Sequence, residues 1–308
     1  NMGGLPTRYE DTAPLYEEIA AAPREEATAI MQRIYAEPQK PELVATRVEE
    51  IKRGGGTAAV SFVPQNAKRM APLAVEAGAD MIVVQATVVT ARHSSKSLKG
   101  LIFSDLIKDI DVPILVGNTV SYEVTKELMQ QGIHGVLVGV GPGSVCTSRE
   151  VLGIGIPQVS ATIECAAARD DFLKETGKYI PIITDGGIRT GGDVCKSFAA
   201  GANAVMIGSP FAKCEEAPAK GYHWGMATWH ESLPRGTRIK MGTEYSLHQL
   251  LYGPSSRTDG TLNLVGALQV CMGYVGAENL REMNNARMVY APAMKTEGKI
   301  YQAAGLGF

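Results

Sequence analysis

Short apolar segments alternate with amphipathic segments from residue 57 onward. The apolar segments are rich in β-branched residues and cover 57–63, 80–85, 113–118, 135–140, 181–186 and 203–208. Runs of this length and composition predict strands that are buried on both faces of a sheet. The amphipathic segments between them predict helices over 67–77, 98–109, 121–131, 160–176 and 191–200.

Regular alternation of strands and helices predicts βαβ units and a parallel sheet, and therefore an α/β fold. We expect a (β/α)8 TIM barrel, which needs eight strands, although six are visible. The opening NMGGL would be the end of another strand, so that the first strand would precede Asn1 and the start of the barrel would be missing from this chain. An open doubly wound sheet is the alternative, and the absence of a GxGxxG turn after an early strand disfavours it.

The rest of the chain is expected to complete one catalytic barrel domain over residues 1–308. Residues 9–53 are rich in Glu, Ala and Arg and predict helices that cover the barrel. The alternation stops after residue 214, and residues 215–262 are rich in loop-forming residues, with a flap-like loop over about 227–262. A last helix is predicted over 263–273, within a C-terminal helix and tail spanning 263–308.

The composition of the chain argues against nucleic acid and membranes as partners. The chain is 45% hydrophobic with a formal net charge of −2, so no basic excess indicates nucleic acid. No apolar run is long enough to span a bilayer and no signal peptide opens the chain, so we expect no membrane partner. The five cysteines form no CxxC pair, which is typical of free thiols in a reducing, cytoplasmic compartment. The five histidines show no metal-ligand spacing.

Candidate chemistry lies where the predicted strands end, because TIM barrels carry their working groups there. Cys146 lies in the glycine-rich segment GVGPGSVCTSREVLGIGIPQ (139–158), where backbone dipoles can activate a thiolate and main-chain carbonyls can bind a monovalent cation. Asp185 ends a strand and could accept hydrogen bonds from a ribose diol. Glycine lets backbone N–H groups approach a phosphate, as Gly186, Gly187, Gly208 and Ser209 would allow. The structural alternative is that these glycines only shape turns and Asp185 only caps a helix.

Three stretches resemble the IMP dehydrogenase/GMP reductase family. They are GVGPGSVCTSREVLGIGIPQ, IITDGGIRTGGDVCKSFAAGANAVMIGS and GYHWGMAT. The chain is most similar to the bacterial IMP dehydrogenase-related subgroup that lacks inserted CBS domains. The resemblance implies a (β/α)8 barrel, a purine nucleotide substrate and a homotetramer or octamer.

The resemblance also implies residue roles. Cys146 would be the nucleophile that attacks C2 of the purine, and Asp185 would bind the ribose. The phosphate would lie on Ser144, Gly187, Gly208 and Ser209, with Tyr222 or His223 near it. Gly225 and Met226 would face the purine, and Asn118 matches a site asparagine. The carbonyls of Gly141, Gly143 and Cys146 would match the family's potassium site.

Departures from the family pattern favour reduction over oxidation. A dehydrogenase activates water with an Arg–Tyr pair on a long flap, but here the interval from Met226 to LPRG (233–236) is short and the only such pair is Arg8–Tyr9. Reductases use a threonine two residues after the cysteine together with a flap glutamate. Those positions read Ser148, with Thr147 beside it, and Arg235. Glu244 or Asp259 would then have to supply the proton, and Glu244 is preferred because it is closer in sequence.

The segment expected to contact the nicotinamide cofactor also differs from the family pattern. The strand end that reads like DSS in the family is Gln85–Ala86–Thr87 here, which weakens an expectation of NAD binding. The leading hypothesis is therefore an NADPH-dependent GMP reductase, which converts GMP to IMP and ammonia through Cys146. An NAD-dependent IMP dehydrogenase, which converts IMP to XMP, is the alternative. A purine nucleotide-binding protein without turnover is the third.

Overall fold

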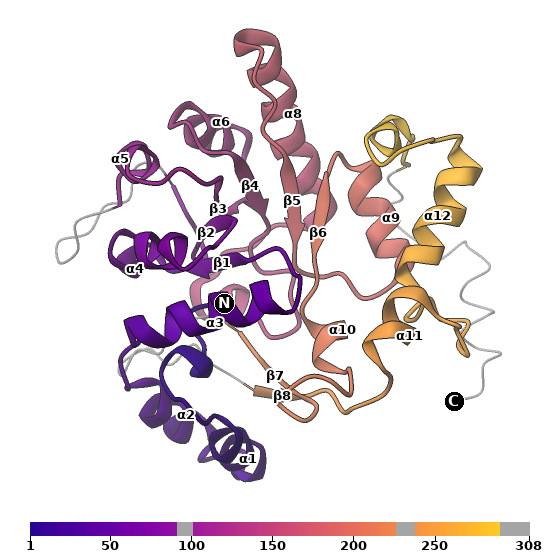
Figure 1. Ribbon diagram of the computed structural model, residues 1–308. Helices are drawn as coiled ribbons and strands as arrows, with labels where there is room; N and C mark the ends of the chain where they lie inside the picture. The colour runs from indigo at the N-terminus through magenta and orange to yellow at the C-terminus, as the bar shows by residue number, and fades with distance from the viewer. Residues whose placement is uncertain (91–100, 226–237, 290–308) are drawn as a thin grey trace.

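Six parallel strands form a curled sheet at the centre of the molecule (Figure 1). The computed structural model describes residues 1–90, 101–225 and 238–289. Each strand pairs in parallel with the next along the chain, from the first to the sixth. The strands are β1 (Ala59–Phe62), β2 (Met81–Gln85), β3 (Ile114–Thr119), β4 (Gly135–Val138), β5 (Ile182–Asp185) and β6 (Ala204–Met206). All six predicted strands are confirmed within a few residues.

Helices α4 (Pro64–Glu76), α5 (Phe103–Lys108), α6 (Tyr122–Gln130), α8 (Gln158–Thr176) and α9 (Gly191–Ala199) lie around the outside of the curled sheet (Figure 1). Two short helices follow strand ends: α7 (Ser148–Leu152) comes after β4, and α10 (Ser209–Ala212) comes after β6. The helix predicted over 98–109 is shorter than expected, since the described part begins at Phe103 and residues 98–100 lie outside the described residues.

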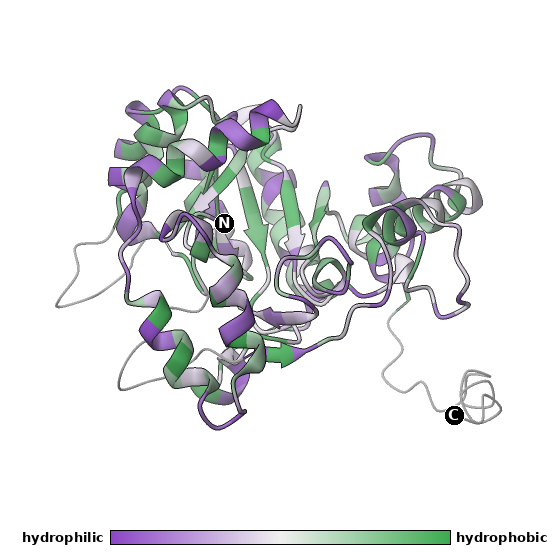
Figure 2. Cartoon of the chain, turned by 60° about the horizontal axis from the view of Figure 1, so that its bottom comes forward, coloured by the Kyte–Doolittle hydropathy of each residue, from purple (hydrophilic) through white to green (hydrophobic). Residues whose placement is uncertain are grey.

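Both faces of the sheet are buried, which explains the continuous apolar runs. Ile82 and Val84 of β2 pack in the large cluster beneath the outer helices, whereas Val83 faces the smaller cluster inside the curl. Leu115 and Leu137 join Val83 there. Successive side chains of a strand point to opposite faces, so each strand supplies both cores. Figure 2 shows the strands as predominantly hydrophobic along their length.

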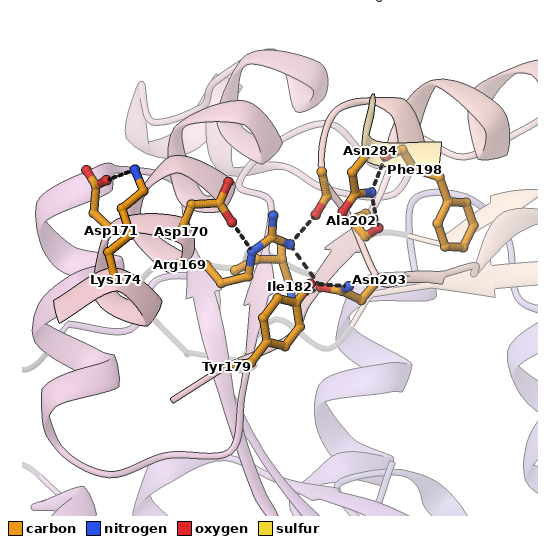
Figure 3. A network of polar contacts seen from close by, with 11 residues as sticks. Arg169, Asp170, Asp171, Lys174, Tyr179, Ile182, Phe198, Ala202, Asn203 and Asn284 are labelled. Atoms are coloured by element: carbon orange, nitrogen blue, oxygen red, sulfur yellow. Dashed lines mark hydrogen bonds and ion pairs between the residues drawn. The ribbon is translucent and has the colours of Figure 1, made fainter. Parts of the chain in front are cut away.

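A buried arginine anchors the start of β6. Arg169 of α8 is 3% exposed, and its Nη1 donates to the carbonyl of Gly201 at 2.7 Å and to Oδ1 of Asn203 at 3.1 Å (Figure 3). Asn203 Oδ1 also accepts from the backbone N–H of Ile182 in β5 at 2.9 Å. Asn284 Nδ2 donates to the carbonyl of Ala202 at 3.2 Å. The network fixes the entry of β5 and β6 relative to α8 and thereby their exits, where candidate site residues lie.

The N-terminal segment is helical, as predicted for 9–53. It contains η1 (Leu5–Thr7), α1 (Ala13–Ala21), α2 (Ala27–Tyr35) and α3 (Pro41–Arg53). The opening NMGGL, residues 1–5, was expected to end a strand, but no strand forms there and Leu5 begins η1. The N–H of Met2 nevertheless donates to the Ser61 carbonyl at 2.9 Å, so this segment lies along the edge of β1.

The C-terminal part carries more structure than its composition indicates. A two-stranded antiparallel hairpin joins β7 (Tyr222–Trp224) to β8 (Arg238–Lys240), and α11 (Leu247–Tyr252) follows. Both elements fall in the segment predicted to be loop. The helix predicted over 263–273 is confirmed as α12 (Leu264–Val275), and η2 (Glu282–Asn285) ends the described part. Among the described helices, none combines the length and apolarity needed to cross a bilayer.

Candidate active site

The carboxyl ends of β2, β3 and β5 meet around one carboxylate, Asp185. Nε2 of Gln85 and Nδ2 of Asn118 each donate to Asp185 Oδ2 at 2.8 Å. The same Asn118 Nδ2 donates to the carbonyl of Gly139 at 2.9 Å, which brings in the end of β4. Topology places these residues together, because parallel strands end at one edge of the sheet.

The two carboxylate oxygens of Asp185 differ in their hydrogen bonds. Burial raises the pKa of Asp185, and the hydrogen bonds from Asn118 and Gln85 lower it in part. Both amides reach Oδ2, whereas no described residue donates to Oδ1. The two amides therefore fix the orientation of the carboxylate and leave Oδ1 without a donor among the described residues.

The Cys146 loop packs directly against the segment that follows Asp185. Gly139 has φ +146°, and a Cβ there would overlap the carbonyl oxygen of Asp185. A Cβ on Gly186, which has φ +98°, would lie 2.9 Å from Cγ of Pro142. Only glycine allows this approach in these conformations. The loop that carries the thiol and the turn that carries the carboxylate are thus one packed unit.

Cys146 is half-buried at the start of the segment that leads into α7. Its Sγ lies 3.4 Å from Oγ of Ser148, and its N–H donates to the Gly143 carbonyl at 3.1 Å. Thr147 is the residue that precedes α7. Burial raises the pKa of another thiol, Cys165, to about 12, so that cysteine is inert at neutral pH.

Two serines and a histidine meet beside this loop. Ser144 Oγ lies 2.6 Å from Ser209 Oγ, and Ser209 Oγ lies 3.1 Å from His223 Nδ1. A Cβ on Gly208 would lie 3.2 Å from Cε1 of His223, so glycine leaves room for the imidazole. Burial lowers the pKa of His223, so the ring is neutral at pH 7. The sequence left Tyr222 and His223 as alternatives here, and His223 is the one that reaches Ser209.

The acidic residues proposed as proton donors lie in other networks. Glu244 accepts from Lys213 Nζ at 2.7 Å and from Arg257 Nη1 at 2.6 Å, and these hydrogen bonds lower its pKa. Hydrogen bonds from Thr261 lower the pKa of Asp259. A carboxylate with a lowered pKa is ionised at neutral pH and is a poor proton donor. This disagrees with the role expected for Glu244.

Other expected site residues are placed with less definition. Gln85 was expected to contact the cofactor, but its amide is bonded to Asp185. Thr87 is half-buried just beyond β2, so its cofactor role stays a prediction. Gly225 follows β7, and Met226 lies outside the described residues.

Metal binding at the Cys146 loop also stays a prediction. The Gly143 carbonyl already accepts the N–H of Cys146, which leaves one lone pair for a cation. Carbonyls of Gly141 and Cys146 would have to supply the other ligands for potassium. The described residues contain no group of three or more His, Cys, Asp or Glu side chains that could hold a metal.

Gln158 was not singled out from the sequence. Its Nε2 donates to the Val138 carbonyl at 2.6 Å, and its Oε1 is buried without a donor among the described residues. It lies beside Gly139, because a Cβ there would be 2.7 Å from Oε1. Its position as the first residue of α8, directly after a proline, gave a helix-start signal but no signal of contact with β4.

Residues 28–240 match the model of the IMP dehydrogenase / GMP reductase domain, which is more than half of the chain. The chain belongs to the IMP dehydrogenase/GMP reductase family. It is similar to a crystal structure of an IMP dehydrogenase/GMP reductase-like protein from Corynebacterium glutamicum, with a TM-score of 0.87 and 33% identity over 94% of this chain and 78% of that chain. This family membership confirms the α/β barrel class expected from the sequence.

Related proteins carry two kinds of name. An "Uncharacterized oxidoreductase" of Mycobacterium leprae is 38% identical over 298 residues, covering 94% of this chain and 80% of the relative. The inosine-5'-monophosphate dehydrogenase of Aquifex aeolicus is 37% identical over 251 residues, covering 76% of this chain and 49% of the relative. The chain is therefore an oxidoreductase of the IMP dehydrogenase/GMP reductase family.

Proposed function

We propose that this protein performs nicotinamide-dependent redox chemistry at C2 of a purine nucleotide through a covalent bond to Cys146. The observation that carries the proposal is the packing of the Cys146 loop. The loop contacts the turn after Asp185 through Pro142 and reaches Ser209 through Ser144. These contacts support the proposal because Cys146, Asp185 and the Ser144–Ser209 pair would serve as the nucleophile, the ribose-binding carboxylate and the phosphate-binding group for one nucleoside monophosphate.

The nucleotide would be held by groups at successive strand ends. Its phosphate would accept hydrogen bonds from Ser144, Ser209 and His223, with backbone N–H groups of Gly187 and Gly208 contributing. A ribose hydroxyl would donate to Asp185 Oδ1. The purine would then extend toward Cys146, where the thiolate can approach C2. Positioning of this kind supplies much of the rate enhancement in an enzyme.

The chemistry then follows from the thiol. The Cys146 thiolate would form a bond to C2 of IMP. A nicotinamide cofactor, when bound, would supply the hydride acceptor for the hydrogen on C2. Water would then add at C2 as the C–S bond breaks, which would release XMP and the free thiol. Ser148 Oγ, 3.4 Å from Cys146 Sγ, is placed to carry a proton near the reacting sulfur.

Two observations favour IMP oxidation over GMP reduction. The reductase needs a proton for the departing ammonia, and the expected donor, Glu244, is held as a carboxylate by Lys213 and Arg257. Relatives from Aquifex aeolicus and Cryptosporidium parvum, 37% and 34% identical, are named inosine-5'-monophosphate dehydrogenase. We therefore place NAD-dependent IMP dehydrogenase first. NADPH-dependent GMP reductase is the second candidate, because the interval between Met226 and 233–236 is short.

Two parallel assays test the proposal. One contains IMP with NAD and the other GMP with NADPH, and cofactor absorbance and product are followed in each. XMP with NADH supports the dehydrogenase, whereas IMP and ammonia with loss of NADPH support the reductase. Cys146→Ala should abolish either activity and leave nucleotide affinity within about tenfold. Cys271→Ala, on α12, serves as the matched control with normal turnover. Tight nucleotide binding without turnover in both assays would indicate a binding protein and overturn the proposal.

A further inference from the structure

Strand β7 has two faces with different partners. Successive side chains of a strand point to opposite sides. His223, in the middle of the strand, reaches Ser209 Oγ in the candidate phosphate site at 3.1 Å. Tyr222 and Trp224, on either side of it, make their contacts elsewhere. The orientation of His223 therefore depends on what holds its two neighbours.

Trp224 is held by the N-terminal helices. Its indole Nε1 donates to the hydroxyl of Tyr35, at the end of α2, at 2.8 Å. Its ring also lies 6.0 Å from the ring of Tyr16 in α1, at an interplanar angle of 41°. Trp224 packs against the small core of these helices, in which Ile19 and Ile34 are buried. Helices α1 and α2 lie beside β7 and β8 in Figure 1.

Tyr222 is held from the neighbouring strand. The guanidinium of Arg238 in β8 lies 4.7 Å from the centroid of the Tyr222 ring, within cation–π range. The same guanidinium donates to backbone carbonyls at the C-terminal end of α1, those of Ile19, Ala20 and Ala22. The last carbonyls of a helix have no partner within the helix, so one arginine satisfies them and ties α1 to the hairpin.

A third contact between the same parts differs in kind. Lys220 Nζ lies 2.8 Å from Glu17 Oε1, but the two side chains are 63% and 64% exposed. Exposed ion pairs of this type contribute little to stability. Substitution of Lys220 is therefore a control, because it removes a contact across the same interface that contributes little to the position of β7.

An open groove of about 440 Å³ runs beside the interface between the helices and the hairpin. It is lined in part by Tyr16, Tyr35, Phe211, Tyr222, His223 and Trp224. Besides its pairing with β8, strand β7 is therefore held against the helices by the hydrogen bond of Trp224 and by the fork of Arg238.

We propose that helices α1 and α2 position His223 through Trp224 and Arg238, and so set the affinity of the site for the phosphate of its nucleotide. Trp224, Tyr35 and Arg238 are positioning residues, since they act on the ligand through His223. This inference rests on the proposed function, because it takes the Ser209–His223 pair as the phosphate site.

The test compares a nucleotide with its nucleoside in the full chain. Trp224→Phe keeps the ring and removes the N–H, and Arg238→Gln removes the fork of donors. Each should raise the Kd for IMP about tenfold, because a misplaced donor loses a hydrogen bond to a charged group. The Kd for inosine, which lacks the phosphate, should stay within twofold. Lys220→Ala should leave both constants unchanged.

Calorimetry with IMP, inosine and inorganic phosphate reads out each outcome. Tyr35→Phe removes the acceptor of the same hydrogen bond, so the double variant with Trp224→Phe should lose no more IMP affinity than either alone. Equal loss for IMP and inosine would indicate a merely structural role and overturn the inference. No loss in any variant would overturn it as well. Unchanged inosine affinity shows that a variant remains folded.

His223→Ala separates this inference from the proposed function. If that variant binds IMP as the wild type does, His223 does not hold the phosphate and the phosphate assignment itself fails. If it loses IMP affinity while Trp224→Phe and Arg238→Gln do not, the phosphate assignment stands and the positioning role is overturned.

Discussion

Replacing Gln85 with leucine isolates what the amide does to Asp185. The side chains are similar in size, so the substitution removes the hydrogen bond from Nε2 to Asp185 Oδ2, 2.8 Å long, and a longer one of 3.1 Å from Nε2 to Asn118 Oδ1. That bond lowers the pKa of Asp185, against the effect of burial. A hydrogen bond to a charged group is worth about 1.5–3 kcal/mol. Loss of about 2 kcal/mol would raise the proton affinity of Asp185 about thirtyfold.

The pH dependence of kcat/KM measures this change. We expect Asp185 to bind ribose as a carboxylate, so kcat/KM falls when the pH drops through its pKa. In Gln85→Leu that pKa is higher, and the acidic limb of the profile should move to higher pH while the alkaline limb stays in place. Asn118→Leu removes the other amide on Oδ2 and should move the limb in the same direction.

Two results of the pH profile of Gln85→Leu would contradict this prediction. An acidic limb that does not move in Gln85→Leu would show that Asp185 is not the group that titrates in the profile. A limb that moves to lower pH would contradict the sign of the electrostatic argument. Thr87→Ser changes a side chain just beyond the same strand and keeps its hydroxyl, so it should reproduce the wild-type profile.

Three further substitutions, one of them with a matched control variant, test other parts of the account. Ser148→Ala should lower kcat about 100-fold at unchanged nucleotide Kd, as steady-state kinetics and calorimetry would show; a wild-type kcat would remove Ser148 from the mechanism. Glu244→Gln should keep turnover within about twofold. At pH 7 its Tm should be lower than that of the wild type, because the lowered pKa of Glu244 means that its ionised form stabilises the native state. This difference in Tm should shrink as the pH falls below 4.5 and the carboxylate is protonated. Gly139→Ala should destabilise the protein by at least about 3 kcal/mol in denaturant titrations because of the overlap with Asp185, whereas Gly153→Ala, with open space around its Cβ, should cost about 1–2 kcal/mol.

The six strands of the sheet were predictable because a strand that is buried on both faces appears in the sequence as a continuous apolar run. In β2, Ile82 and Val84 serve one core and Val83 the other, so no polar position interrupts the run. The β7–β8 hairpin was not predictable. Its strands are three residues each, too short for a clear alternation of polar and apolar side chains, and Trp224 and Arg238 contact α1 and α2, which lie far away in sequence.

The main site residues were predictable because strand ends meet at one edge of a parallel sheet. That rule brought Cys146, Asp185 and Ser209 together before any side chain was placed. It could not say that Gln85 turns toward Asp185, since this depends on a side-chain direction. Glu244 was preferred only for its closeness in sequence, which says nothing about its ion pairs with Lys213 and Arg257. Its role as a proton donor stays a prediction.

The Arg8–Tyr9 pair lies far in sequence from the predicted flap, and in the structure it contacts the N-terminal helices. The Arg8 guanidinium lies 5.5 Å from the centroid of the Tyr35 ring, and Tyr9 donates to the carbonyl of Ile34 at 2.8 Å. Both side chains hold the N-terminal helices. In position the pair is thus structural, and its use as a dehydrogenase base has no support from these contacts.

Trapping the covalent intermediate tests the central claim most directly. The protein would be mixed with IMP and NAD, and separately with GMP and NADPH, quenched in acid and digested for mass spectrometry. The account predicts a purine nucleotide adduct on the peptide that contains Cys146 during turnover with one of these pairs, and none in Cys146→Ala. Turnover without an adduct on Cys146, or turnover that persists in Cys146→Ala, would contradict it.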